Sequence, residues 1–354
     1  MRVRALVLAA GFGTRLRPLS AVLPKPLLPV LGRPLLAHSL ERLRALRAEA
    51  TAVNLHHLGD HVEEAFGDAY EGMPLRYSHE ERLGPEPLGT AGALVPLCDF
   101  LRDADAAIVI NGDSLCRWPL RALLRRHRRS GADATLLLAR RADPNRFGGG
   151  VGVGRDGFLV DFRPPSAGED RAQERLVFAG AHVLSARLLE HVAELRAPSD
   201  LVRDVYEPML RGGARFAALR SSTPWHDLGI PARYLDALVE WARSPWLRRW
   251  RVGKPRRSFR AKDAQIGARV RLRSAAIESG AVIGAGSSLE QSLVFPGARV
   301  GERCLVRRSI VGPGVVLPDG AAVEARLVTV QQTRQSPGPA DSVLGDLVFT
   351  PIGG

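Results

Sequence analysis

A glycine-rich turn and a single lysine are the features of this sequence that point most directly to chemistry. The turn, Gly11-Phe12-Gly13-Thr14-Arg15, follows a short apolar run, and Lys25 comes soon after it between two prolines. Of the 50 basic residues only three are lysine, and Lys25 is the one lysine among the first 253 residues. An ammonium and a planar guanidinium meet phosphate oxygens differently, so a lysine kept in an arginine-rich chain indicates a specific role. Backbone amides exposed by glycine, together with Arg15 and Lys25, predict a polyphosphate site.

The turn differs from two common phosphate-binding motifs. Leu16 stands where the dinucleotide fingerprint has its third glycine, and no Gly-Lys-Ser/Thr sequence follows, as a Walker loop requires. The apolar run before the turn predicts a buried strand over residues 3–9. The turn would then lie at the carboxyl end of a strand, where open α/β sheets bind their ligands.

Two carboxylates are candidates for a metal site. Asp113 follows Asn111-Gly112 after an apolar run, and Asp227 follows Trp225-His226. From the residues alone, Asp113 is better explained as a turn former and Asp227 as a helix cap. A divalent cation held by both acids is the functional alternative.

Other chemistry-bearing residues favour structural interpretations. His57 and His61 are four residues apart, but no glutamate lies between them in the metalloprotease arrangement, so they predict a solvated helix start. No GxSxG sequence is present, and Cys116 is expected to be a small buried filler rather than a nucleophile. The three cysteines form no CxxC pair, which is typical of a reducing cytoplasm.

The elements that must position these residues alternate between strands and helices. This alternation predicts βαβ units and a doubly wound, Rossmann-like α/β core with a largely parallel sheet. The predicted strands are 3–9, 51–55, 75–78, 106–110 and 134–139, with a hairpin over 148–162, and the predicted helices are 34–47, 89–100, 120–129 and 231–241.

A different pattern begins after residue 260. From residue 266 to residue 317 the helical period is absent and apolar residues recur every six positions. Ile/Val-Gly pairs mark this repeat at Ile266, Ile283, Val300 and Val311. A six-residue period predicts a parallel β-helix, whose coils stack around one shared core.

Length and composition set the domain organisation. A chain of 354 residues with 45% apolar residues predicts two domains with sizeable cores. We expect a catalytic domain over 1–245, a basic linker over 246–260, a β-helix over 261–325 and a loosely ordered tail over 326–354 with an added strand at 347–350. The net charge of +13 is spread along the chain, which argues against a nucleic-acid partner. The absence of an apolar run of about 20 residues argues against a membrane span.

Several motifs in order resemble the sugar-1-phosphate nucleotidyltransferases, also called NDP-sugar pyrophosphorylases. The resemblance rests on GFGTRLRPLS followed by LPKPLLPV, on EPLGTAGAL over 86–94, on VINGD over 109–113 and on WHDLGIP over 225–231. EPLGTAGAL and the repeat tail look most similar to mannose-1-phosphate guanylyltransferases. The resemblance implies a nucleotidyltransferase core, a β-helix that is left-handed, and transfer of a nucleotidyl group to a sugar 1-phosphate with release of pyrophosphate.

The resemblance also implies roles for individual residues. Arg15, Lys25 and Asp113 would be catalytic, and Asp113 and Asp227 would hold Mg²⁺. Lys25, Gly148 and Arg163 would contact the sugar phosphate. The nucleotide would be bound by the glycine turn and two later positions, namely Ala10, Gly11, Gly13, Thr14, Arg15, Gly89 and Asp113.

The sequence departs from the family pattern on the sugar side. Many members have Glu-Lys-Pro where this chain has Phe162-Arg163-Pro164, and Asn-Ala-Gly where it has Phe178-Ala179-Gly180. We therefore expect GTP and mannose 1-phosphate as substrates and keep two alternatives, a UTP- or dTTP-dependent enzyme and a non-catalytic nucleotide-sugar sensor. The β-helix is expected to mediate homo-oligomerisation in the cytoplasm. An acyltransferase, the third class that a hexapeptide repeat suggests, is disfavoured because residues 266–317 contain no histidine.

Overall fold

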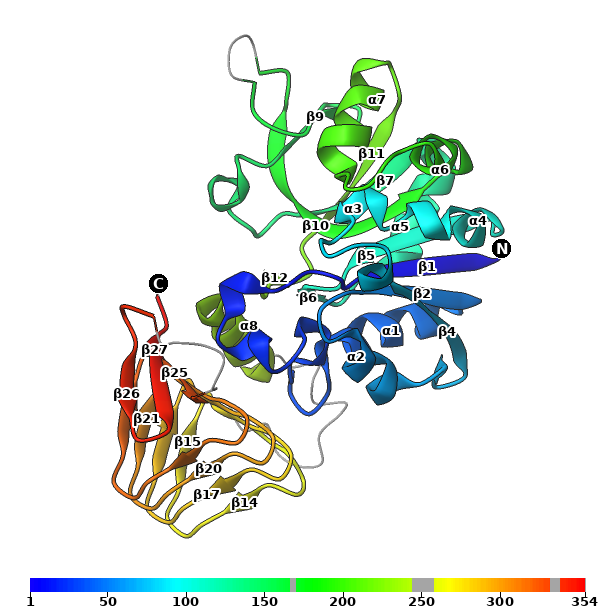
Figure 1. Cartoon of the computed structure of the whole chain (residues 1–354). Coiled ribbons are helices and arrows are strands. Elements are labelled where there is room, and N and C mark those ends of the chain that lie inside the picture. The colour runs from blue at the N-terminus through cyan, green and yellow to red at the C-terminus, as the bar shows by residue number, and fades with distance from the viewer. Residues whose placement is uncertain (166–169, 244–257, 332–337, 354) are drawn as a thin grey trace. The chain divides into compact units, whose positions relative to one another are not determined.

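The computed structural model describes residues 1–165, 170–243, 258–331 and 338–353 (Figure 1). The predicted basic linker lies outside the described residues up to residue 257. The chain packs into two compact units that are not contiguous in sequence. The first contains Met1–Phe12, Pro24–Pro26 and Leu35–Trp225, and the second contains Gly13–Leu23, Leu27–Pro34 and His226–Gly354.

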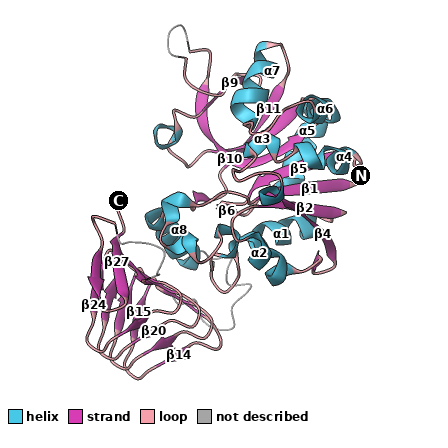
Figure 2. Ribbon diagram, viewed as in Figure 1, coloured by secondary structure: helices cyan, strands magenta, loops and turns pink. Residues whose placement is uncertain are grey.

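The first unit is built on a sheet of mostly parallel strands, as the alternating pattern predicted (Figure 2). Its main path has the order β11-β7-β10-β5-β1-β2-β4-β3, in which β10 runs antiparallel to both neighbours, β5 and β7. The strands are β1 (Val3–Leu8), β2 (Ala50–Leu55), β3 (Ala69–Tyr70), β4 (Met73–His79), β5 (Ala106–Asn111), β7 (Ala134–Ala139), β10 (Glu174–Leu184) and β11 (Phe216–Ser221). The predicted hairpin is confirmed as β8 (Val151–Val153) paired with β9 (Leu159–Asp161).

Helices cover both faces of this sheet, which confirms the doubly wound class. α1 (Leu35–Leu46) lies beside α5 (Leu120–Ser130), and α4 (Cys98–Arg102) lies beside α6 (Ala186–Ala193). Strand side chains alternate between the two faces, and those on one face pack with α4 and α6 in a single cluster. The remaining helices of the unit are α2 (Gly59–Phe66), α3 (Gly89–Gly92) and α7 (Glu207–Arg211), and a π-helix spans Leu201–Tyr206.

The continuous helix predicted over 89–100 is wrong. The structure divides this stretch into α3, a 3-10 turn at Val95–Leu97 and α4. Pro96 explains the division, since proline cannot donate the backbone hydrogen bond that a continuing helix needs.

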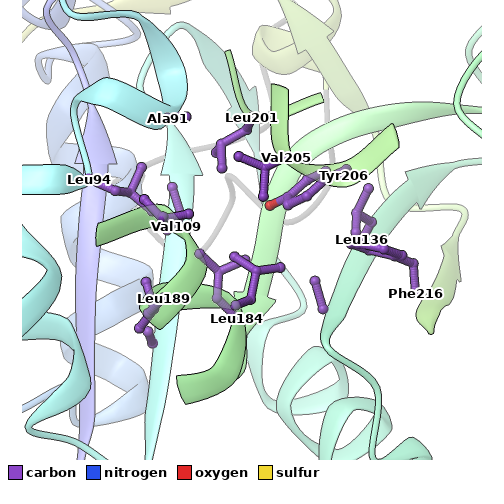
Figure 3. Close-up of a cluster of buried hydrophobic side chains, with 14 of the residues drawn as sticks. Ala91, Leu94, Val109, Leu136, Leu184, Leu189, Leu201, Val205, Tyr206 and Phe216 are labelled. Carbon is purple, nitrogen blue, oxygen red and sulfur yellow. The ribbon is translucent and has the colours of Figure 1, made fainter. Parts of the chain in front are cut away.

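The cluster between the sheet and the α4/α6 layer forms much of the core (Figure 3). Leu136, Val205 and Phe216 are fully buried there. Tyr206 is also fully buried, and its hydroxyl lies 2.6 Å from Nδ1 of His182. Buried polar groups are tolerated when they are hydrogen-bonded, and burial lowers the pKa of His182 to about 3.

The second unit contains the predicted parallel β-helix. In the strand pairing, Ile266 lies opposite Ile283, Ile283 opposite Val300 and Val300 opposite Leu317. Paired residues are thus 17 positions apart in the sequence, which is the length of one coil. Three stacked parallel sheets result, one for each side of the coil. Their strands are β13 (Phe259–Arg260), β16 (Ala276–Ile277), β19 (Leu293–Val294), β22 (Ile310–Val311) and β25 (Arg326–Val330); β14 (Gln265–Ile266), β17 (Val282–Ile283), β20 (Arg299–Val300) and β23 (Val316–Leu317); and β15 (Arg271–Arg273), β18 (Ser288–Glu290), β21 (Leu305–Arg307) and β24 (Ala322–Glu324).

The end of the chain is more ordered than the sequence suggested. β27 (Leu347–Pro351) runs antiparallel to β25, and β26 (Ser342–Leu344) pairs with β27. Leu347 and Val348 are buried, so the added strand extends one side of the solenoid and covers apolar surface. The short range predicted for this strand, 347–350, agrees with the structure to within one residue.

The second unit also holds α8 (Pro231–Arg243), which confirms the helix predicted over 231–241. Three 3-10 turns, Thr14–Leu16, Leu19–Ala21 and Lys25–Leu27, lie within the motif region near the N-terminus. β6 (Ser114–Cys116) directly follows the predicted acid Asp113, and β12 (Trp225–Asp227) ends at the predicted acid Asp227. None of the helices in the described part of the chain is long and apolar enough to cross a bilayer.

Candidate active site

The backbone that enters the glycine turn is fixed by a side chain from the neighbouring strand. β1 ends at Leu8, and the amide of Ala9 donates a 2.7 Å hydrogen bond to Oδ1 of Asn54 at the end of β2. Ala10 is buried, whereas a Cβ added to Gly11 would meet no atom of the described residues within 4 Å. The chain therefore leaves β1 in a defined direction and exposes the Gly11 backbone.

The same asparagine connects the turn to the EPLGT motif. Nδ2 of Asn54 donates to Oε1 of Glu80 at 2.6 Å, and Oε2 of Glu80 accepts from the amide of Leu88 at 2.8 Å. Asn54 and Glu80 are both nearly fully buried. Neither residue is predicted by a motif of the sequence, although a polar residue at the end of an otherwise apolar strand is a signal for Asn54.

Gly89 is required by its backbone conformation and by its packing. Its φ is +79°, and an added Cβ would lie 2.4 Å from the carbonyl oxygen of Ser199. That carbonyl accepts from the amide of Ala91, and Thr90 Oγ1 donates to Asp200. The predicted nucleotide-binding position at Gly89 thus lies at the start of α3, which residues 199–200 hold in place.

The structure brings Lys25 and Asp113 together. The ammonium lies 3.1 Å from Oδ2 of Asp113, and the side chains are 11% and 41% exposed respectively. Gly112 allows the close approach of this loop to β1, because its amide donates to the carbonyl of Leu8 and an added Cβ would lie 2.7 Å from that oxygen. Both motif residues belong to the first unit.

In the second unit, Arg15 and Asp227 meet at Gly229. A Cβ added to Gly229 would lie 2.9 Å from Nη2 of Arg15 and 2.9 Å from Oδ1 of Asp227. Asp227 is also ion-paired with Arg233. Gly13 adopts φ +62°, and its carbonyl accepts from the hydroxyl of Ser20, which fixes the turn that leads to exposed Thr14 and Arg15.

The predicted sugar-side residues Gly148 and Arg163 lie in the first unit, and among the described residues no hydrogen bond or ion pair joins them. Gly148 ends a 3-10 turn at φ +68°, next to Phe147, whose ring packs edge-on against Trp225 at 5.2 Å between centroids. Arg163 is 63% exposed and pairs with Glu207 at 3.2 Å. The exposed guanidinium is thus already partly neutralised by a carboxylate of the same unit.

Gly180 has a packing role. It belongs to Phe178-Ala179-Gly180, which stands where many family members have Asn-Ala-Gly. Its φ is +80°, and an added Cβ would lie 2.8 Å from Cβ of Asn111. β10 changes register between Phe178 and His182, so Gly180 lies within an irregular stretch of the strand. The glycine is therefore demanded by the approach of β10 to the Asn-Gly-Asp motif.

Each of the two predicted acids, considered in its own unit, offers oxygen ligands to a hard cation. Oδ2 of Asp113 contacts Lys25 and Oδ1 accepts weakly from Ser114 at 3.3 Å, which leaves further lone pairs on a half-exposed carboxylate. In the second unit, the carboxylate of Asp227 lies beside Arg15 and Arg233. Carboxylate oxygens are ligands that suit a hard cation such as Mg²⁺.

The residues set aside at the sequence level keep structural roles. His57 and His61 are exposed. Cys116 is buried, and burial raises the pKa of its thiol to about 12, so the thiol stays protonated.

A separate group of potential metal ligands, Asp60, His79 and Glu81, has ligand atoms within 4.8 Å of one another. Both ring nitrogens of His79 already lie 2.8 Å from carboxylates, those of Glu63 and Glu81.

Comparisons with known proteins show the family to which the chain is similar. Residues 4–244 match the family model described as Nucleotidyl transferase, and residues 251–329 match the one described as GlmU-like, C-terminal hexapeptide. A mannose-1-phosphate guanylyltransferase of Mycobacterium tuberculosis is 34% identical over 253 residues, which cover 70% of this chain and 68% of the relative.

Similar proteins are also found at lower sequence identity. The mannose-1-phosphate guanylyltransferase catalytic subunit beta of Xenopus tropicalis is 27% identical over 68% of this chain, a match that spans 65% of that relative, just under two thirds. The crystal structure of HddC from Yersinia pseudotuberculosis complexed with GMP-PN superposes with a TM-score of 0.54 at 22% identity, covering 68% of this chain and 100% of that one. At this identity the likeness concerns the fold alone.

Proposed function

Because the chain belongs to the nucleotidyl transferase family, we propose that it transfers a nucleotidyl group from a nucleoside triphosphate to a sugar 1-phosphate. GTP and mannose 1-phosphate are the proposed substrates, and GDP-mannose and pyrophosphate the products. The names of the relatives from Mycobacterium tuberculosis and Xenopus tropicalis support this choice of base and sugar. The observation that carries the proposal is the 3.1 Å contact between Lys25 and Asp113, because it joins two of the motifs in one place.

The reaction is an in-line displacement at the α-phosphorus. An oxygen of the sugar phosphate forms a new bond to this phosphorus while the bond to the bridging oxygen of pyrophosphate breaks. Such transfers depend on positioning and on stabilising charge that develops on phosphate oxygens. We assign the β- and γ-phosphates to Arg15 and the amides of Gly11 and Gly13, and the α-phosphate and the incoming sugar phosphate to Lys25.

Asp113 and Asp227 are the residues that would hold a divalent cation, for which Mg²⁺ is our choice. Bound to phosphate oxygens, such an ion neutralises charge on the triphosphate. In the protein itself, Lys25 balances the charge of Asp113 and Arg233 that of Asp227. Each acid is thereby held in one orientation by a cation of its own unit.

On the sugar side, we assign Arg163 to the sugar phosphate together with Lys25 and Gly148. Arg163 stands where many family members have lysine, and its guanidinium would have to exchange Glu207 for a sugar phosphate. Because the Arg163 side chain is 63% exposed, solvent screens its pairing with the less exposed Glu207, and its rupture costs little, on the order of 1 kcal/mol or less. Arg163 is therefore available to the sugar phosphate in spite of its partner.

A matrix of nucleoside triphosphates against sugar 1-phosphates tests the reaction. Product mass and released pyrophosphate are measured for each pair in the presence of Mg²⁺. The highest kcat/KM is expected for GTP with mannose 1-phosphate. If only UTP or dTTP is turned over, the proposed specificity for guanine is wrong. If nucleotides bind but no pair is turned over, the protein is better explained as a non-catalytic nucleotide-sugar sensor.

We also propose that the β-helix joins copies of this chain in the cytoplasm. Its coils and final hairpin expose large apolar side chains, namely Leu305, Val316, Val343 and Leu344. The three cysteines are free and buried, which suits a reducing compartment. In light scattering, Val316→Asp combined with Leu344→Asp should lower the molar mass of the full chain. The similarly exposed Leu83 of the first unit provides the control, as Leu83→Asp should leave that mass unchanged.

A further inference from the structure

The segment that follows Lys25 folds as a tight, buried turn. Only Pro26 separates the lysine from Leu27–Pro34, a segment that packs in the second unit. Leu28 and Val30 are fully buried, and the Val30 amide donates to the carbonyl of Arg33 at 2.7 Å. The turn passes through left-handed conformations at Leu31 and Gly32, with φ values of +52° and +86°.

Residues from the C-terminal part of the chain hold this turn. The hydroxyl of fully buried Tyr234 donates to the carbonyl of Pro29 at 2.5 Å. The ring of Phe259 lies against Gly32, where an added Cβ would approach its Cζ to 2.9 Å. Oε2 of Glu278 accepts a 2.8 Å hydrogen bond from the Gly32 amide, and the Leu31 amide also bonds to this carboxyl group.

Glu278 is an unusual residue for its place in the solenoid. It directly follows β16, and the same position in the next two coils holds Phe295 and Gly312. Its side chain is 1% exposed, and its Oε1 has no hydrogen-bond partner among the described residues. Burial raises the pKa of Glu278 to about 7. A buried carboxyl group is costly, and the repeat does not require one here, so its role lies in the contact with the turn.

We propose that Glu278 is a positioning residue, which holds the Leu27–Pro34 turn by its backbone amides and thereby fixes the segment that carries Lys25. The inference rests on the proposed function, because only a catalytic Lys25 makes its placement matter for turnover. It gives the β-helix a part in the reaction in addition to self-association. The two prolines beside Lys25 restrict the backbone between the lysine and the turn, so displacement of the turn is passed along the chain.

Two variants separate this role from general stability. Glu278→Met fills the same space without an acceptor, whereas Glu278→Gln keeps an oxygen for the Gly32 amide. Hydrogen exchange measured by mass spectrometry should be about tenfold faster over residues 27–34 in the Met variant and unchanged in the Gln variant. Glu324→Met, at an exposed position of the same solenoid, provides the control.

Kinetics completes the test. We expect kcat to fall about tenfold or more in Glu278→Met with little change in KM for the triphosphate, and to recover in Glu278→Gln. Equal exchange or equal kcat in the two variants would overturn the positioning role. If Glu278→Met does not fold, Tyr234→Phe replaces it, because it removes another hydrogen bond to the same turn. If the unaltered protein turns over no substrate pair, the proposed function fails, and the exchange measurement still decides whether Glu278 holds the turn.

Discussion

The ammonium of Lys25 lies 3.1 Å from a carboxylate oxygen of Asp113, although 88 residues separate them in the sequence. The lysine is mostly buried and the aspartate is half-exposed. This arrangement orients a positive charge beside a carboxylate that still has free lone pairs, as a site for phosphates and a divalent cation requires. The pair therefore links the proline-flanked lysine to the Asn-Gly-Asp motif physically.

Replacement of Lys25 should impair chemistry more than folding. Lys25→Ala is expected to lower kcat/KM by about 100-fold or more, since it removes charge stabilisation at the transferred phosphate. Lys25→Arg should recover only part of the activity, because a guanidinium cannot replace a compact ammonium at one phosphate oxygen. Steady-state kinetics checks both values, with the exposed Lys262→Ala as the control. An unchanged kcat/KM in Lys25→Ala would remove this residue from the site.

Loss of either acid should weaken the dependence on the metal ion. Asp113→Asn and Asp227→Asn are each expected to raise the Mg²⁺ concentration for half-maximal activity by about tenfold or more, because each removes a charged oxygen ligand. Titration of activity with Mg²⁺ measures this shift. Asp99→Asn serves as the control, since the Asp99 side chain is 97% exposed. Titration curves that match the unaltered protein would argue for turn-forming and capping roles instead.

Gly89→Ala should be strongly destabilising. The new methyl group would meet the carbonyl of Ser199 at 2.4 Å at the start of α3, where the backbone has a positive φ, and such strain costs on the order of 1–3 kcal/mol. Urea unfolding followed by circular dichroism measures the loss. Gly84→Ala is the matched control, because an added Cβ there meets no atom of the described residues within 4 Å. Equal free energies of unfolding for the two variants would contradict the packing that we describe.

Glu278 should make stability depend on pH. Its pKa is about 7 in the folded chain against an ordinary value of 4.5, so the folded state binds the proton more tightly. Its contribution to stability is therefore complete below pH 4.5 and is lost as pH rises to about 7. The size of this loss is on the order of 3 kcal/mol.

The difference in unfolding free energy between Glu278→Gln and the unaltered protein isolates this effect. We expect the Gln variant to gain relative stability between pH 4.5 and 7 and the gain to level off above pH 7. His182, with its folded pKa lowered to about 3 from 6.5, gives the opposite slope as pH falls from 6.5. That contribution is common to both proteins and cancels in the difference. A difference that does not vary with pH would show that the Glu278 carboxyl group titrates normally.

Local patterns were sufficient to predict most of the fold. The six-residue period of the C-terminal region predicted the β-helix because each coil repeats the same inward and outward positions. The alternation of apolar runs with amphipathic stretches likewise predicted the mostly parallel sheet. The helix predicted over 89–100 is divided at Pro96, whose missing backbone amide interrupts the helical hydrogen bonds.

The candidate site was only partly predictable. Residue type and spacing single out the glycine turn and Lys25 as a candidate phosphate site, whereas Asp113 and Asp227 became metal-site candidates only through the resemblance to the family. Asn54 and Glu80 support the turn and the EPLGT loop through contacts that no local motif specifies.

The sequence by itself thus determined the class of fold, which follows from short-range periodicity, and its family motifs named the candidate site residues. Only the tertiary structure decided which distant residues meet, such as Lys25 with Asp113 and Gly32 with Glu278. It also decided that the turn after Lys25 packs with the C-terminal unit. These contacts depend on how whole elements pack, and burial of a carboxyl group such as that of Glu278 is a property of that packing and not of its neighbours in the chain.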